Sequence, residues 1–136
     1  MHRPLLIVGG ILNSMLALFH VSLGRQIQVL PGVTPDQRAL MEMLNAGGTI
    51  MIVFFAVGSF GFASDLLNTK LGKLFLGFVS VLYISRAVEE IVLSPRFSAV
   101  IFGVCVLIAL IYLALLLVPF RPARIEGQSA RVTGAR

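Results

Sequence analysis

Charged residues are scarce in this sequence: Lys, Arg, Asp and Glu make up 12% of its 136 residues, against about 25% in an average soluble domain. Hydrophobic residues make up 57% of the chain. A soluble domain of this length could not bury so much apolar surface. The composition therefore excludes an ordinary soluble domain and indicates a membrane protein, and the length suits one compact unit.

Cysteine is nearly absent, and the common motifs of catalysis are missing. Cys105 is the single cysteine, so no internal disulfide can form, and a thiol packed in an apolar run is usually inert. The sequence has no phosphate-binding Gly-rich loop, no nucleophile elbow and no His-Glu-x-x-His. His2 and His20 are expected at opposite membrane faces, which argues against bis-histidine haem ligation. We therefore expect no metal or cofactor, and we favour a protein without enzymatic activity.

The basic residues do not form a nucleic-acid surface. The formal net charge is +5, but the Lys and Arg residues lie between or after apolar runs and share no face with aromatic residues. Placement around membrane-spanning segments explains this pattern. We therefore expect a lipid bilayer as the partner and no nucleic acid.

Four apolar runs are long enough to cross a membrane, which takes about 20 helical residues for ~30 Å of hydrocarbon. They predict helices at about 4–24, 35–64, 71–93 and 95–118. The expected fold is an all-α membrane protein, with a four-helix transmembrane bundle over residues 1–120 and a basic, disordered tail over 121–136. The first run also resembles a cleaved signal peptide, but Asn13 interrupts it and it is long for a signal core.

Two helix starts carry sequence signals. Thr34, Pro35 and Gln37 stand in the order of a capping box with proline at the first helical position. Ser94 and Pro95 repeat the cap and proline before the fourth run. Between the second and third runs, residues 65–73 read as a polar turn. These signals predict where the spans leave the lipid.

The distribution of Lys and Arg predicts the orientation. With four spans, the N-terminus, the loop between the second and third helices and the tail share one side. That side holds seven basic residues: Arg3, Lys70, Lys73, Arg121, Arg124, Arg131 and Arg136. The other side holds Arg25, Arg38 and Arg96. The positive-inside rule therefore predicts that both termini are cytoplasmic in a multi-pass protein of a bacterial inner membrane.

The third predicted helix carries three charges in an apolar setting, and these define the candidate site. Each charge would cost about 2.5–3.5 kcal/mol at the bilayer centre, so such residues usually face a bundle interior or a watery pocket. The predicted orientation places other polar side chains at a similar depth in the outer third. The full set is His20, Asn45, Tyr83, Arg86, Glu89 and Glu90.

Spacing restricts the pairing within this set. Arg86 stays protonated and requires an anion, and Glu90 lies one turn away on the same face. Glu89 could face the headgroups, pair with a protonated His20, or keep its proton because burial disfavours the charge. The polar neighbours of Arg86 are expected to come from the first two spans.

Three interpretations of this polar cluster remain. The side chains could be structural, neutralising one another and joining helices, as polar residues often do in membrane bundles. They could line an outward-facing pocket for a small ligand, ion or proton. They could also form an interface with another membrane protein. The alternative function is an accessory or assembly subunit of a larger membrane complex, with the polar cluster purely structural, and the partners expected beside lipid are a second copy of the chain or another membrane protein.

Two segments carry a resemblance to a known group of proteins. They are residues 36–45, Asp-Gln-Arg-Ala-Leu-Met-Glu-Met-Leu-Asn, and 85–91, Ser-Arg-Ala-Val-Glu-Glu-Ile. With His20 late in the first helix, they resemble a group of small bacterial membrane proteins of four helices without an established activity. The resemblance implies the four-helix fold and no reaction. Small multidrug transporters fit less well, because their proton-coupling Glu in the first helix has no counterpart beside Asn13 and His20.

Overall fold

The computed structural model describes residues 2–118 and shows a helical protein. Its helices are α1 (His2–Gln28), α2 (Pro35–Gly61), α3 (Ala63–Asn68), α4 (Lys70–Val92) and α5 (Ala99–Leu116). No strand occurs within these residues. The four long helices are apolar and long enough to cross a membrane. The predicted all-α fold with four candidate spans is therefore confirmed, while the predicted tail, 121–136, lies outside the described residues.

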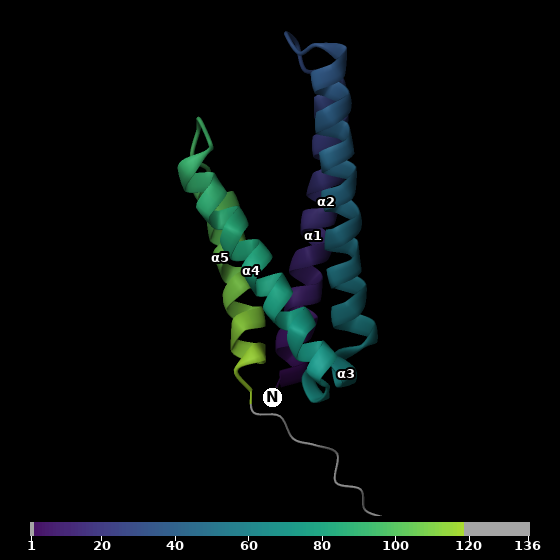
Figure 1. Ribbon diagram of the computed structural model, residues 1–136, viewed down its shortest axis with the longest axis vertical. Helices are drawn as coiled ribbons and strands as arrows, with labels where there is room; N and C mark the ends of the chain where they lie inside the picture. Colours follow the sequence, from purple (N-terminus) through teal and green to yellow (C-terminus); the bar gives the residue numbers. More distant parts are fainter. Residues whose placement is uncertain (1, 119–136) are drawn as a thin grey trace, which may run out of the picture.

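The long helices form two pairs that meet in the shape of a V (Figure 1). The first arm is α1 packed against α2, and the second arm is α4 packed against α5. The arms meet where α1 begins, α5 ends and α3 lies, which we call the closed end. They separate toward the connections 29–34 and 93–98, which we call the open end.

The buried core lies toward the closed end, where the arms touch. Leu6 of α1, Phe55 of α2, Leu76 of α4 and Leu115 of α5 are almost fully buried there. Large apolar side chains on the outer faces of all four long helices stay exposed. This distribution suits helices whose outer faces meet lipid, because hydrocarbon does not drive apolar side chains inward as water does.

The start of α2 matches the predicted capping box. Thr34 Oγ1 accepts a hydrogen bond from the Gln37 amide at 3.3 Å, and the Thr34 amide donates to Gln37 Oε1 at 3.1 Å. Pro35 is the first helical residue. Gly32, with a φ of 76°, makes the turn before it, a conformation that glycine adopts without steric cost.

The start of α5 differs from the prediction: the helix begins at Ala99 instead of Pro95, and Ser98 caps it instead of Ser94. The reason lies in α4, whose Glu90 Oε1 accepts a hydrogen bond from the Ser98 amide at 2.9 Å. Ser94 Oγ instead donates to the Arg96 carbonyl oxygen at 2.9 Å within the connection. Sequence signals around Pro95 could not show this contact.

The predicted polar turn at 65–73 is largely helical. It contains residues 65–68 of α3 and the first turn of α4, joined at Thr69. Thr69 Oγ1 accepts from the Gly72 amide at 2.9 Å and donates to the Asp65 carbonyl oxygen at 2.7 Å. A Cβ at Gly72 would lie 2.4 Å from the Leu66 backbone. Glycine therefore permits the tight reversal between α3 and α4.

Candidate functional site

A buried polar network joins all four long helices where the arms meet. Its members are Asn13 of α1, Ser59 of α2, Tyr83 of α4 and Tyr112 of α5, and each is at most 2% exposed. Tyr83 donates to Asn13 Oδ1 at 2.5 Å, and Asn13 Nδ2 donates to the Tyr112 hydroxyl at 3.1 Å. The Ser59 and Tyr112 hydroxyls lie 2.5 Å apart.

Every proton in this network has an assignable place. Asn13 Nδ2 also donates to the Gly9 carbonyl oxygen at 2.8 Å, and Ser59 donates to the Phe55 carbonyl oxygen at 2.8 Å. Because the Ser59 proton is used, Tyr112 must donate to Ser59 while accepting from Asn13. Buried polar groups stabilise a fold when all of them are paired, so the network fixes how the arms cross.

Glycine makes room for this network. A Cβ at Gly9 would lie 3.0 Å from both Cε2 and the hydroxyl of Tyr112, so the tyrosine ring packs directly on the backbone of α1. From the sequence, Asn13 was noted as a polar residue that interrupts the first apolar run, and neither it nor Tyr112 was part of the predicted site. The sequence placed Tyr83 with the charged residues, whereas its hydroxyl bonds Asn13.

His20 and Asn45 form a reciprocal pair within the first arm. Asn45 Nδ2 donates to the backbone carbonyl oxygen of His20 at 3.0 Å, and Asn45 Oδ1 lies 3.0 Å from His20 Nδ1. Since a carbonyl oxygen only accepts, the amide orientation is set, and His20 Nδ1 must carry the proton. Nε2 is then an acceptor, and no hydrogen bond to it occurs within residues 2–118.

Arg86, Glu89 and Glu90 form a second group on α4. Arg86 Nη2 lies 3.4 Å from Glu90 Oε2, and Nη1 lies 3.7 Å from Glu89 Oε2. The Glu90 side chain is 4% exposed, whereas those of Arg86 and Glu89 are 45% and 52% exposed. The ion-pair partner of Glu89 is Arg86 on its own helix, which none of the three predicted alternatives for Glu89 named. The group lies in the last two turns of α4, close to the connection that follows.

The two polar groups are not joined. Within the described chain, no hydrogen bond or ion pair connects His20 or Asn45 with Arg86, Glu89 or Glu90. The expectation that the first two spans supply the partners of Arg86 is therefore not met, because its own helix supplies them. At the open end, each arm carries its own polar group.

Charged side chains also hold the two ends of α5. Lys73 Nζ donates to the carbonyl oxygens of Leu115, Leu116 and Val118 at 2.8, 3.0 and 2.7 Å. Glu90 binds the Ser98 amide at the other end. A cation at the C-terminus of a helix and an anion at its N-terminus both match the helix dipole. The sequence marked Lys73 only as a loop residue that sets orientation.

Metal binding and family membership find no support. Within the described residues, no group of three or more His, Cys, Asp or Glu side chains could hold a metal ion. Comparison of the chain with protein-family models, curated proteins and solved structures gave no match. Function is therefore inferred from the geometry of the chain itself.

Proposed function

We propose that the chain is a multi-pass protein of a bacterial inner membrane with its closed end in the cytoplasm. The closed end carries Arg3, Lys70 and Lys73, and the sequence adds four Arg after Val118. The open end carries Arg25, Arg38 and Arg96. This imbalance follows the positive-inside rule. A C-terminal reporter fusion active only in the periplasm would contradict the orientation.

We further propose that the open end binds a small ligand, ion or proton, with His20 as the main contact. The observation that carries this proposal is the imidazole orientation set by Asn45, which leaves Nε2 as an acceptor. Nε2 can accept a proton, or a hydrogen bond from a donor, without breaking either hydrogen bond between His20 and Asn45. Histidines that coordinate metal ions are oriented in a similar way, by a hydrogen bond from the other ring nitrogen. Arg86 and Glu89, which are half exposed on the second arm, supply charges at the same end.

Nitrogen NMR of the imidazole ring tests this proposal. His2 is the only other histidine, so His2→Gln protein labelled in histidine reports on His20 alone. We expect the Nδ1–H tautomer of the neutral ring in wild type and loss of the tautomer preference in Asn45→Ala. An Nε2–H tautomer at high pH would contradict the site.

Ligand binding is tested by melting temperature in detergent with a panel of divalent cations and small polar molecules. A shift in wild type that is lost in His20→Ala and Arg86→Ala supports a ligand site. Tyr83→Phe is the matched control, because it alters the buried network instead. Equal shifts in wild type and His20→Ala would contradict binding at this residue.

An accessory or assembly role is the second candidate function, with the polar groups purely structural. The observation that favours it is the internal pairing of Glu90, which binds both Arg86 and the Ser98 amide. Crosslinking in native membranes followed by pull-down tests this function. A chain recovered only as a monomer, without a second copy or another membrane protein, would count against it.

A further inference from the structure

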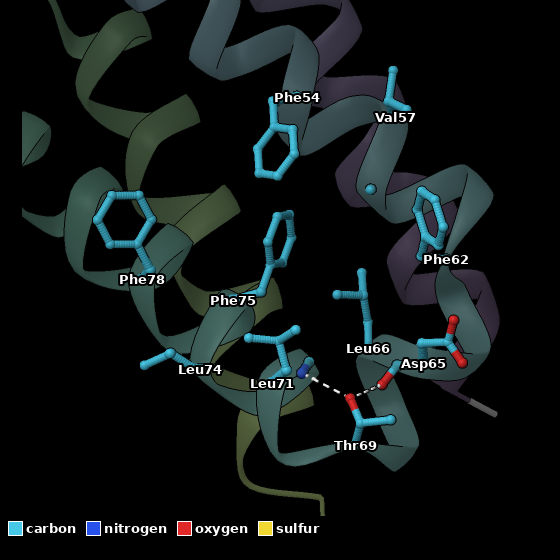
Figure 2. A pocket seen from close by; sticks show the side chains of 12 residues that line it. Phe54, Val57, Phe62, Asp65, Leu66, Thr69, Leu71, Leu74, Phe75 and Phe78 are labelled. Carbon is cyan, nitrogen blue, oxygen red and sulfur yellow. Dashed lines mark hydrogen bonds between the residues drawn. The ribbon is translucent and has the colours of Figure 1, made fainter.

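An apolar pocket lies between α2, α3 and the first half of α4, away from the polar site (Figure 2). Its volume is about 580 Å³, within the range of roughly 300–1,000 Å³ found for small-molecule sites. Phe54 of α2 and Phe75 and Phe78 of α4 line one part, and Asp65 and Thr69 lie together at the other end (Figure 2). The pocket is therefore lined by apolar side chains along most of its length and has polar residues at one end.

The backbone builds this pocket. The short helix α3 lies between the end of α2 and the start of α4. Gly58 takes the Phe75 ring against the backbone of α2, where a Cβ would lie 2.8 Å from the ring. The Phe75 ring therefore packs directly on the α2 backbone at Gly58. This contact forms one boundary of the pocket.

The surroundings of the pocket restrict its occupant. Its walls belong to α2 and α4, two of the candidate membrane spans. The polar end lies where α2 has ended and α4 begins, and Phe78 lies eight residues into α4, about 12 Å farther along the helix. An occupant must therefore be an amphiphile with its polar group at the closed end and its chain directed toward the open end.

The charged side chains at the closed end of the pocket restrict the headgroup of the amphiphile. Asp65 is an exposed carboxylate that lines the pocket. The exposed Lys70 does not line the pocket, but it begins α4 between two lining residues, Thr69 and Leu71. Within residues 2–118, no salt bridge uses either side chain. A carboxylate accepts hydrogen bonds from a primary ammonium, and a lysine pairs with a phosphate. A headgroup that carries both charges complements this pair of side chains.

We propose that the pocket binds a zwitterionic phospholipid with a primary ammonium headgroup, the chemistry of phosphatidylethanolamine. One acyl chain packs against Phe54, Phe75 and Phe78. The ammonium lies at Asp65 and the phosphate at Lys70. Anionic lipid is disfavoured beside the carboxylate, and a quaternary choline head cannot donate a hydrogen bond to it.

Tryptophan quenching tests this assignment, because the chain contains no tryptophan. Phe78→Trp puts a single reporter on the pocket wall, and Leu107→Trp is the matched control on α5. The two positions are 54% and 48% exposed and lie eight and nine residues from the closed ends of their helices. Leu74→Trp on the same wall is a second pocket reporter. Each variant is placed in choline-lipid nanodiscs with a small fraction of lipid brominated on its acyl chain.

We expect brominated ethanolamine lipid to quench the pocket reporters as if enriched about threefold to fivefold, the range for one partly exposed ion pair. The control reporter should follow the bulk fraction. Asp65→Asn should return the pocket reporters to the bulk value, while Asp36→Asn, at the open end, should not.

Four results would overturn the proposal. Equal quenching of pocket and control reporters would show no preferred occupant. Equal or stronger enrichment of a lipid with a glycerol or choline headgroup would show that the pocket does not select a primary ammonium. Enrichment of ethanolamine lipid that survives Asp65→Asn would show that the carboxylate does not bind the headgroup. Quenching weaker at the pocket than at the control would mean that protein, from a second copy or another chain, covers the pocket.

Discussion

The two arms of the molecule are joined by different chemistry. In the first arm, α1 and α2 have 27 residues each and share a neutral pair, His20 with Asn45. In the second arm, α4 and α5 have 23 and 18 residues, and the charged Lys73 and Glu90 bind the two ends of α5. The longer arm, α1 with α2, is thus held mainly by packing along the helices. In the shorter arm, α4 is bound to α5 by charged side chains at both ends of α5.

The difference shows what charges do near a membrane. A buried charge is retained only with a partner, and the free backbone groups at a helix end are suitable partners. Lys73 and Glu90 bind such groups at the two ends of α5, where the polypeptide leaves the apolar region. Lys73 and Glu90 are therefore explained by the helical hairpin of α4 and α5 that they close.

The largest expected effect comes from breaking the joint between the arms. Asn13→Leu leaves the Tyr83 hydroxyl without an acceptor and removes a donor to Tyr112. We expect the free energy of unfolding to fall by about 2–4 kcal/mol, because buried polar groups lose their partners. Unfolding in mixed detergent micelles measures this change, and spin labels at the open end report whether the arms spread.

Ser14→Ala is the matched control for that substitution. Ser14 donates to the Gly10 carbonyl oxygen within α1, so its loss should cost less than about 0.5 kcal/mol. Similar losses for Asn13→Leu and Ser14→Ala would mean that the arms hold together by apolar packing alone.

A smaller effect is expected from loosening the second arm. Glu90→Ala removes the acceptor of the Ser98 amide and one partner of Arg86. We expect a loss of about 1–3 kcal/mol and faster hydrogen exchange at the start of α5. Glu90→Gln should restore part of the loss, since its amide oxygen can still accept. Glu89→Ala, half exposed and 3.7 Å from Arg86, should change little; an equal effect of both would refute the capping role.

The sequence correctly predicted four long apolar helices, because a helix of membrane-spanning length is marked by composition over about 20 residues. Its local signals were reliable where both partners are near in the chain, as in the box at Thr34. They failed at Pro95, where the deciding partner is Glu90 of the preceding helix. Helix ends set by a distant side chain are not visible in local patterns.

The candidate site was predicted in pieces. Residues at i and i+4 share a helix face, so the Arg86 and Glu90 pair could be predicted and is observed at 3.4 Å. Depth in the membrane could not show that His20 and Asn45 belong to the first arm and the charged group to the second. The sequence therefore predicted one polar cluster, where the structure has two. The network at Asn13 was missed as a unit because it needs the crossing of four helices.

The smallest expected effect concerns the neutral pair of the first arm. A double-mutant cycle with His20→Ala and Asn45→Ala should give a coupling of about 0.5–1 kcal/mol, in line with single hydrogen bonds between membrane helices. A Cβ at Gly48 would lie 3.6 Å from Cε1 of the His20 ring, so the ring packs over the α2 backbone at this glycine. The His20 single variant therefore also loses packing, which the cycle subtracts. A coupling near zero would show that the two bonds do not hold α1 to α2. Helices α1 and α2 would then be held together by packing alone. The hydrogen bonds with Asn45 would no longer explain the orientation of the His20 ring.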